Sequence, residues 1–185
     1  HEDPRRQRQM CIRDRLGGVP KMVRTGHTFM KKELREFPGS PMAGEMSGHF
    51  FMNDHWDGFD DSIYCAARLL SIIGTDPSPE LGGPKFSERF DFLPEYPTTD
   101  EGKVPLVGER EEVMEAVVSA FSDMPTSTVD GIRVRYDDGW YLCRPSNTEP
   151  ILVMRAEGRN QAALDYILSD VGRRIGEIVD LEKLK

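Results

Sequence analysis

The first half of the chain alternates between short extended patterns and amphipathic helical ones. Residues 18–24 predict a strand, and residues 28–37 carry apolar residues at helical spacing, with Thr28 as the expected N-cap. Residues 41–52 predict a second strand, and residues 60–73 a second helix. The order strand, helix, strand, helix is typical of an α/β domain, here without the opening strand that a full layer needs.

The sequence of the helix expected at 60–73 indicates where it begins and which face it buries. Asp60 and Asp61 fall in its first turn, where negative charge complements the helix dipole. Its apolar face, which we expect to be buried, consists of Ile63, Ala66, Ala67 and Leu70.

The second half of the chain has a different pattern. A loop-rich stretch at 75–84, a short helical stretch at 86–94 and a linker at 95–102 lead into it. The pattern then predicts a helix at 109–121, strands at 132–136, 140–143 and 151–155, and a final helix at 160–179. Asp137, Asp138 and Gly139 supply a turn between the first two strands. The fold class is therefore α/β followed by an α+β unit with an antiparallel sheet and two helices.

Composition narrows the function classes. The 185 residues carry a net charge of −8, which argues against nucleic acid or an anionic membrane as the main partner. No apolar run approaches the roughly 18 residues that a transmembrane helix requires. Cys11, Cys65 and Cys143 form no CxxC pair and make a poor disulfide framework, which favours a reducing, cytoplasmic setting.

Residues 1–15 differ from the rest of the chain in charge. They hold five Arg against three acidic residues, whereas the other 170 residues carry 19 basic and 29 acidic ones. A basic arm suggests nucleic-acid binding or a targeting peptide, but residues 5–15 back-translate into the transposase-type adaptor used to prepare sequencing libraries. We therefore expect residues 1–15 to be a translated adaptor and the natural sequence to start near Leu16, inside a gene.

The motif Gly44-Glu-Met-Ser-Gly-His49 is the first that carries chemistry. If the stretch is extended, Glu45, Ser47 and His49 share one face, because alternate residues of a strand point the same way. A carboxylate beside a hydroxyl suits the vicinal diols of a sugar. The alternative is an edge strand with a solvated polar face. Together with His27, these side chains do not have a spacing that indicates a metal site.

Two further motifs suit anions. Arg144-Pro-Ser-Asn-Thr-Glu-Pro150 places short polar residues and an arginine fork between two strands, a combination that fits phosphate. The alternative is an ordinary Ser/Asn turn with a surface arginine. In Arg24-Thr-Gly-His27, His27 lies just ahead of a helix N-terminus, although a lone histidine there is more often structural.

Taken together, these motifs resemble the α-D-phosphohexomutases, and most closely the bacterial phosphomannomutase/phosphoglucomutase group. The resemblance rests on RTGHTFMKKEL, GEMSGH, WDGFDDSIYCAARLL and RPSNTEP, and covers about 18–180. Members of this family have four domains. The resemblance implies a truncated third domain at 16–95, with the sugar-reading loop, and a fourth domain at 96–185, with the phosphate-binding loop.

The resemblance also assigns roles to individual residues. Glu45 and Ser47 match the residues that hold the sugar hydroxyls O3 and O4. His49 matches a histidine near the reacting centre that is a candidate for proton transfer, and His27 matches a second histidine near the ligand. The loop that grips the phosphate not being transferred corresponds to Arg144, Ser146, Asn147 and Thr148.

Three positions differ from related sequences, and two of them bear on the substrate. Arg24 stands where related sequences often have Lys, so its equivalence is not assured. Met46 and Asn147 stand where phosphoglucosamine mutases commonly have Gln and Gly, so the sequence leans toward glucose and mannose phosphates.

The activity implied for the full-length parent is the interconversion of hexose 1-phosphate and hexose 6-phosphate. It runs through a hexose 1,6-bisphosphate and an enzyme phosphoserine, with Mg²⁺ as cofactor. The domains that carry the serine and the magnesium-binding aspartates are missing, so we expect this fragment to be inactive.

Its expected partners are small sugar phosphates, without nucleic acid or membrane, and no oligomeric state is indicated. The alternatives are a non-catalytic sugar-phosphate-binding protein or pseudoenzyme, and a phosphoglucosamine mutase.

Overall fold

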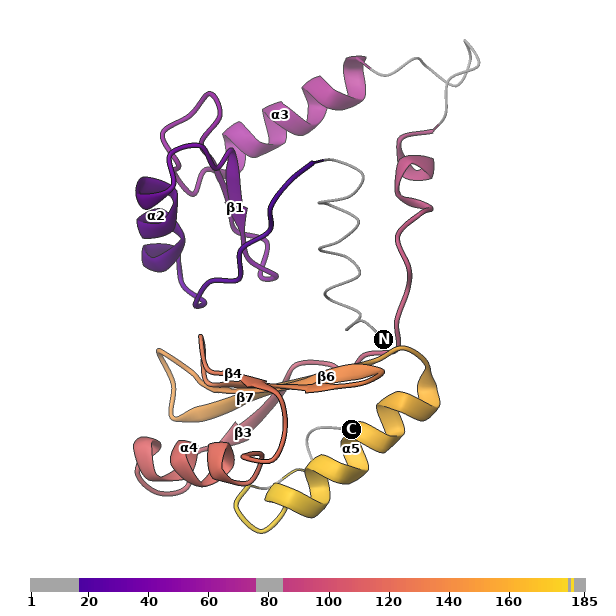
Figure 1. Ribbon diagram of the computed structural model, residues 1–185. Helices are drawn as coiled ribbons and strands as arrows, with labels where there is room; N and C mark the ends of the chain where they lie inside the picture. Colours follow the sequence, from indigo (N-terminus) through magenta and orange to yellow (C-terminus); the bar gives the residue numbers. More distant parts are fainter. Residues whose placement is uncertain (1–16, 76–84, 180, 182–185) are drawn as a thin grey trace. The chain divides into compact units, whose positions relative to one another are not determined.

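The computed structural model describes residues 17–75, 85–179 and 181. These residues form two compact units, Met22–Pro94 and the part from Glu95 onward together with residues 17–21, and each is described by itself (Figure 1). The expected adaptor at 1–15 and all but the first residue of the expected loop at 75–84 lie outside the described residues. No helix in the described ranges is both long and apolar enough to cross a membrane.

The first unit begins with helix α2 (His27–Glu36). Gly26 precedes it with φ of 130°, a conformation that favours glycine, and its carbonyl accepts from the N–H groups of Phe29 and Met30. Gly26 is therefore the N-cap, and the prediction that Thr28 caps the helix is wrong by two residues. Met30 and Leu34 are buried by packing with Phe51.

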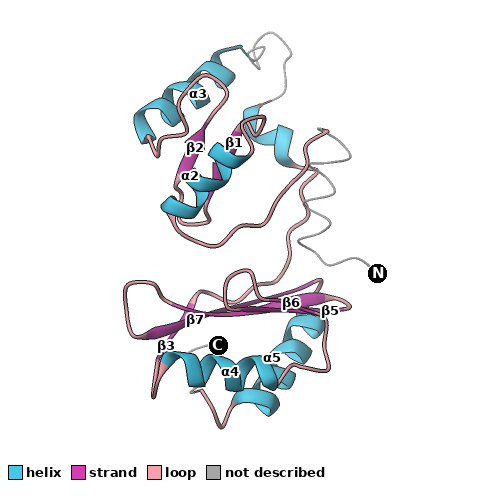
Figure 2. Ribbon diagram, turned by 60° about the vertical axis from the view of Figure 1, so that its left-hand side comes forward, coloured by secondary structure: helices cyan, strands magenta, loops and turns pink. Residues whose placement is uncertain are grey.

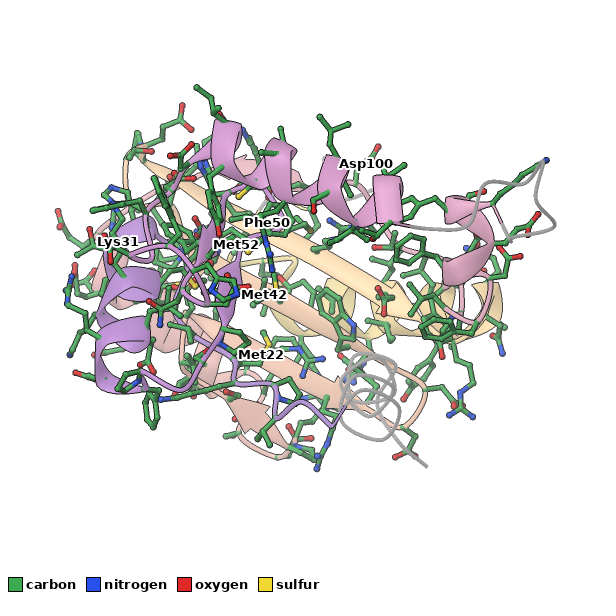
Figure 3. All side chains as sticks on the ribbon, turned by 90° about the horizontal axis from the view of Figure 1, so that it is seen from above. Met22, Lys31, Met42, Phe50, Met52 and Asp100 are labelled. Atoms are coloured by element: carbon green, nitrogen blue, oxygen red, sulfur yellow. The ribbon has the colours of Figure 1, made fainter. Side chains whose placement is uncertain are left out.

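A two-stranded hairpin, β1 (Met42–Gly44) and β2 (Phe50–Met52), packs against α2. The strands are antiparallel, and Met42 lies opposite Met52; Figure 3 labels their side chains and that of Phe50. The prediction of one continuous strand at 41–52 is wrong, because the chain reverses at 45–49 with Gly48 at φ of 91°. Residues 18–24 form no strand within the described part of the chain, so that prediction is also wrong.

Helix α3 (Ser62–Thr75) begins two residues later than expected. Asp61 precedes it as a cap, since its Oδ1 accepts from the N–H groups of Ile63 and Tyr64 at 3.0 Å. Ile63 is 82% exposed and Leu70 67%, so the face expected to be buried is open to solvent in this structure. The unit continues to a short 3-10 helix, η2 (Phe86–Phe90).

The second unit is a five-stranded antiparallel sheet in the order β3-β7-β6-β5-β4. Its elements are β3 (Gly102–Pro105), α4 (Arg110–Ser119), β4 (Thr126–Ser127), β5 (Ile132–Tyr136), β6 (Gly139–Pro145), β7 (Ile151–Gly158) and α5 (Gln161–Ile175). Figure 2 shows α4 and α5 on one face of the sheet.

The sequence pattern explains this second unit well. Ile132, Val134 and Tyr136 alternate into the core, and Tyr136 pairs with Gly139 across the two-residue turn. The predicted α+β unit with its central hairpin and two helices is therefore confirmed. The pattern missed the short edge strands β3 and β4, and β7 runs three residues further than expected.

A buried carboxylate ties α5 to the sheet. Asp170 is 8% exposed, and it accepts from the Tyr136 hydroxyl at 3.0 Å, from Arg174 Nε at 2.8 Å and from the Arg173 guanidinium. Arg174 extends the network, because its guanidinium also binds the Asp123 carboxylate through two nitrogens, at 2.7 and 2.9 Å. Burial alone would raise the pKa of Asp170, but the hydrogen bonds from Arg173, Tyr136 and Arg174 outweigh it and hold the pKa below the ordinary value.

We predict that this network makes the second unit sensitive to acid. A carboxyl with a lowered pKa in the folded state supplies stability above about pH 4, where the unfolded chain is also ionised, and loses it as the pH falls through the lowered value. Asp170→Asn should reduce the free energy of unfolding by on the order of 3 kcal/mol at neutral pH and flatten the acid slope. Urea unfolding followed by the fluorescence of the buried Trp140, in a Trp56→Phe background, measures both.

Asp165→Asn is the matched control, because Asp165 lies on the exposed face of the same helix and bonds only to Gln161 among the contacts that the structure resolves for it. It should leave stability and acid slope nearly unchanged. Equal acid slopes in the wild type and in Asp170→Asn would contradict the assignment to Asp170.

Candidate functional site

Residues 45–49 form the loop of the β1–β2 hairpin. The loop is closed by the Glu45 N–H donating to the His49 carbonyl at 2.9 Å and by the Gly48 N–H donating to the Glu45 carbonyl at 3.1 Å. Ser47 is exposed, and the Met46 side chain is 66% exposed. The expectation that Glu45, Ser47 and His49 share the face of one strand is therefore wrong; a tight turn presents them instead.

The Glu45 carboxylate joins this loop to the start of α2. Its Oε1 accepts from the Gly26 N–H at 2.7 Å, across 19 residues of sequence. A carboxylate suits this position, because the first N–H groups of a helix lack partners within the helix and carry partial positive charge. The bond brings the motif Arg24–His27 next to the motif 44–49, which the separate motifs could not reveal.

His27 and Arg24 lie at this same helix start. His27 is the first residue of α2 and is exposed. The Arg24 guanidinium carbon lies 4.7 Å from the centre of the Phe29 ring, a cation–π contact that holds the side chain beside the first turn. The structure therefore brings Glu45 to the helix start that carries Arg24 and His27, and His49 closes the same hairpin loop through its carbonyl.

His49 has a partner that the sequence analysis did not foresee. Its Nδ1 lies 2.8 Å from Asp60 Oδ2. Asp60, expected within the first turn of a helix, instead forms an isolated β-bridge to Phe51. The side chains are 53% and 31% exposed, respectively, so the pair lies at the surface.

The loop after β6 contains the other predicted residues. The Ser146 N–H donates to the Ile151 carbonyl at 2.9 Å, and its Oγ accepts from the N–H groups of Thr148 at 3.3 Å and Glu149 at 3.2 Å. Ser146 is 7% exposed, whereas Asn147 and Thr148 are exposed. Ser146 therefore stabilises the loop from inside, whereas Asn147 and Thr148 are exposed to solvent.

Arg144 is held at the base of this loop. Its Nε lies 3.8 Å from Asp130 Oδ2, and the side chains are 16% and 15% exposed. The distance exceeds that of a hydrogen bond, so the contact is an ion pair. Gly131, next to Asp130, has φ of 67°, and a Cβ there would lie 2.3 Å from the Cys143 carbonyl oxygen. The Asp-Gly pair before a strand indicates a turn at this position but does not identify Asp130 as the partner of Arg144.

The core cysteine and the potential metal ligands add nothing to the candidate site. Burial raises the pKa of the Cys143 thiol to about 12, so this core cysteine stays protonated. Within the ranges that the structure describes, no group of three or more His, Cys, Asp or Glu side chains could hold a metal ion. The described side chains therefore do not fit the magnesium that the resemblance implies for the parent enzyme.

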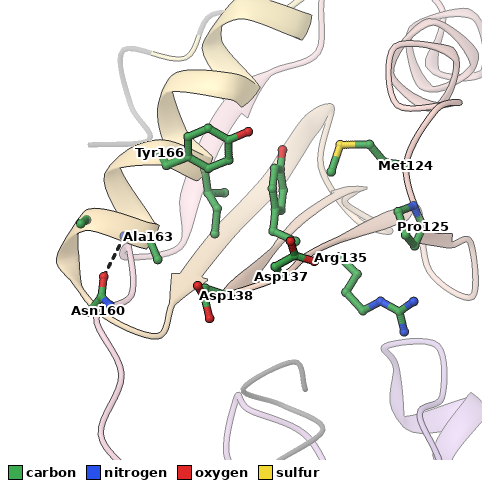
Figure 4. A pocket seen from close by; sticks show the side chains of 11 residues that line it. Met124, Pro125, Arg135, Asp137, Asp138, Asn160, Ala163 and Tyr166 are labelled. Carbon is green, nitrogen blue, oxygen red and sulfur yellow. Dashed lines mark hydrogen bonds between the residues drawn. The ribbon is translucent and has the colours of Figure 1, made fainter. Parts of the chain in front are cut away.

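An open pocket of about 790 Å³ lies near the N-terminus of α5 (Figure 4). Asp137, Asp138, Asn160 and Tyr166 line it, at the turn that precedes β6. Arg144 is near the other end of β6, roughly 17–20 Å away for a strand of this length. Asn160 caps α5 through Ala163, and Asp138 pairs with Arg159 at 3.4 Å, so two of its polar groups have structural roles.

Two family models match the chain. One, described as the phosphoglucomutase/phosphomannomutase alpha/beta/alpha domain III, covers residues 11–90, and the other, the C-terminal domain of the same enzymes, covers residues 98–173. Both descriptions name the class of sugar-phosphate mutases that the motifs resemble. The first match begins within residues 1–15, so the boundary of the expected adaptor stays a prediction.

Individual relatives agree with the family models. The chain is 40% identical over 154 residues to a phosphomannomutase/phosphoglucomutase of Pseudomonas syringae pv. tomato, and 40% identical over 156 residues to a phosphoglucomutase of Neisseria gonorrhoeae. Each alignment covers 82% of this chain and 32% of the relative. The chain thus spans about a third of the length of these relatives.

A solved structure matches the fold as well. A phosphoglucomutase/phosphomannomutase family protein from Burkholderia thailandensis aligns with a TM-score of 0.77 and 36% identity, over 95% of this chain and 36% of that one. The chain belongs to the phosphoglucomutase/phosphomannomutase family.

The close approach at Gly131 generates a prediction. Gly131→Ala should destabilise the second unit by on the order of 1–3 kcal/mol, because the side chain is strained at positive φ and collides with the backbone of Cys143 and Arg144. Gly172→Ala is the control: this glycine lies inside α5 with open space around its Cβ, so the substitution should stabilise by up to about 1 kcal/mol. Thermal unfolding of both variants measures the difference, and equal effects would contradict the close packing at Gly131.

Proposed function

We propose that this chain is the substrate-recognition part of a phosphomannomutase/phosphoglucomutase. The parent enzyme would interconvert hexose 1-phosphate and hexose 6-phosphate through a hexose 1,6-bisphosphate and a phosphoserine in another part of the protein. The observation that carries the proposal is the match of both units to consecutive domains of this family. Membership of the family makes the parent an isomerase, and a cytoplasmic location is part of the same proposal.

The loop after β6 would bind the phosphate that is not transferred. In an acidic chain an anion needs a local concentration of positive charge, and Arg144 supplies a planar fork that suits phosphate oxygens. Because Asp130 faces Nε, the two terminal nitrogens of the guanidinium would be the ones that reach the ligand. Ser146 stabilises this loop through its hydroxyl group, and the exposed Asn147 and Thr148 would add neutral hydrogen bonds to the phosphate.

The hairpin loop 45–49 would read the sugar hydroxyls. The Glu45 Oε1 already accepts from Gly26, so the carboxylate is oriented before the ligand arrives, and its other oxygen would accept from a hydroxyl group. Ser47 is exposed beside it. His49 would exchange a proton with the reacting hydroxyl, and His27 and Arg24 would lie near the ligand at the start of α2.

The fragment by itself would bind sugar phosphates without turning them over. The described residues do not fit Mg²⁺, so its ligands would come from another part of the parent enzyme. Met46 and Asn147 favour glucose and mannose phosphates over glucosamine phosphate as ligands. Tight binding of glucosamine phosphate would instead support a phosphoglucosamine mutase.

The sequence of the parental gene upstream of Leu16 tests the proposal as a whole. We expect genomic reads that cross this junction to lack the adaptor and to encode a serine-containing active-site loop and a DGDGD-like aspartate loop. Adaptor-free reads in which neither loop is encoded upstream would contradict the mutase and favour a non-catalytic binding protein.

Calorimetry on the chain tests recognition. We expect glucose 1-phosphate to bind, and Arg144→Ala to weaken binding of both glucose 1-phosphate and inorganic phosphate by about 1.5–3 kcal/mol, the range for a charged hydrogen-bond partner. Glu45→Gln should weaken glucose 1-phosphate only, because its partner is a hydroxyl group.

The control for this experiment is Arg135→Ala. Arg135 is an exposed arginine of β5 that lines the open pocket, so its loss removes the same charge elsewhere in the unit. It should leave both affinities unchanged. If Arg135→Ala and Arg144→Ala lose the same affinity, the effect comes from net charge and not from the loop after β6. If Glu45→Gln weakens glucose 1-phosphate and inorganic phosphate equally, Glu45 does not bind the sugar hydroxyls alone.

A further inference from the structure

The surface pair of His49 and Asp60 has no evident role in stability. Exposed ion pairs contribute little, because water screens the charges and both side chains lose freedom. We propose that Asp60 is a positioning residue for His49: it fixes which ring nitrogen carries the proton and directs the other toward the ligand. That the other nitrogen faces the ligand rests on the proposed function. That Nδ1 carries the proton rests on the contact with Asp60 alone.

The chemistry of the contact decides the tautomer. An ionised carboxylate only accepts hydrogen bonds, so the His49 nitrogen at 2.8 Å from Asp60, Nδ1, must carry a proton. When the ring is neutral, the lone pair is therefore on Nε2, at the opposite side of the ring. A group that takes a proton from a hydroxyl needs this arrangement, and the carboxylate also stabilises the cation that forms when Nε2 accepts the proton.

Both residues of the pair are anchored through their backbones. Asp60 is bridged to Phe51, which is fully buried in the core of the first unit, and Asp61 caps α3 immediately after it. The His49 carbonyl accepts from the Glu45 N–H, which closes the hairpin loop. The carboxylate thus comes from one ordered segment and the imidazole from another, so the ring orientation follows from the fold.

Nitrogen NMR of the imidazoles tests the proposal on the 185-residue chain. At about pH 8.5 histidine is neutral, and the nitrogen shifts of the ring report which tautomer is present. We expect His49 to show the protonated Nδ1 form as the main species, with its signals assigned by their loss in His49→Gln. A His49 ring protonated mainly on Nε2 in the wild type would overturn the proposal, whatever the variants do.

Two substitutions separate Asp60 from its surroundings. Asp60→Ala removes the acceptor but keeps the backbone bridge to Phe51, so His49 should shift to a mixture of both tautomers. Asp61→Asn removes the same charge one residue away and keeps an oxygen that caps α3, so it should leave the tautomer as in the wild type. An unchanged tautomer in Asp60→Ala, with amide spectra that show an intact fold, would overturn the proposal.

This result is independent of the calorimetry. A protonated Nδ1 in a chain that fails to bind glucose 1-phosphate would leave the positioning intact and contradict the proposed function. Binding of glucose 1-phosphate by a chain whose His49 is protonated on Nε2 would support the proposed function and overturn the role of Asp60.

Discussion

The first unit depends on one hydrogen bond, from the Gly26 amide to the Glu45 carboxylate. It joins the start of α2 to the turn of the hairpin, next to the small apolar cluster of Met30, Leu34 and Phe51. A bond to a charged acceptor contributes about 1.5–3 kcal/mol, which is substantial beside so small a core. The same carboxylate is a candidate ligand group, so stability and recognition in this unit share a residue.

The two units differ in how their candidate residues are supported. In the second unit, Arg144 lies on a strand that is paired on both sides and backed by two helices with a continuous core. In the first, the loop 45–49 sits on two three-residue strands, and α3 has no buried residue in the described part of the chain. Short loops on a rigid scaffold hold geometry well, so the loop after β6 has the more rigid support.

Local patterns predicted most of the second unit and part of the first. Alternation at 132–136 and the Asp-Asp-Gly turn encode the central hairpin within a dozen residues, which is why it was predictable. The turn at Gly48 was missed because Met46 and Phe50 continue an extended apolar pattern through it. Thr28 lost its expected capping role to Gly26, whose backbone conformation a sequence pattern does not show.

The candidate residues were predictable by type but not by partner. Glu45, His49 and Arg144 stand in recognisable motifs, yet each has a partner 11 to 19 residues away: Gly26, Asp60 and Asp130. Such contacts depend on the path of the chain between the two residues and not on either motif. The motifs therefore indicated the chemistry, and the fold supplied the groups that orient it.

The pairing of Arg144 with Asp130 affects how tightly an anion can be held. A guanidinium that already faces a carboxylate attracts a phosphate less strongly than an isolated one, since the negative charge of Asp130 opposes the incoming anion. If a phosphate binds there as proposed, repulsion between the two anions would speed its dissociation. In the proposed function, where the bisphosphate would be released and rebound in the reverse orientation, this weaker attraction would shorten each exchange.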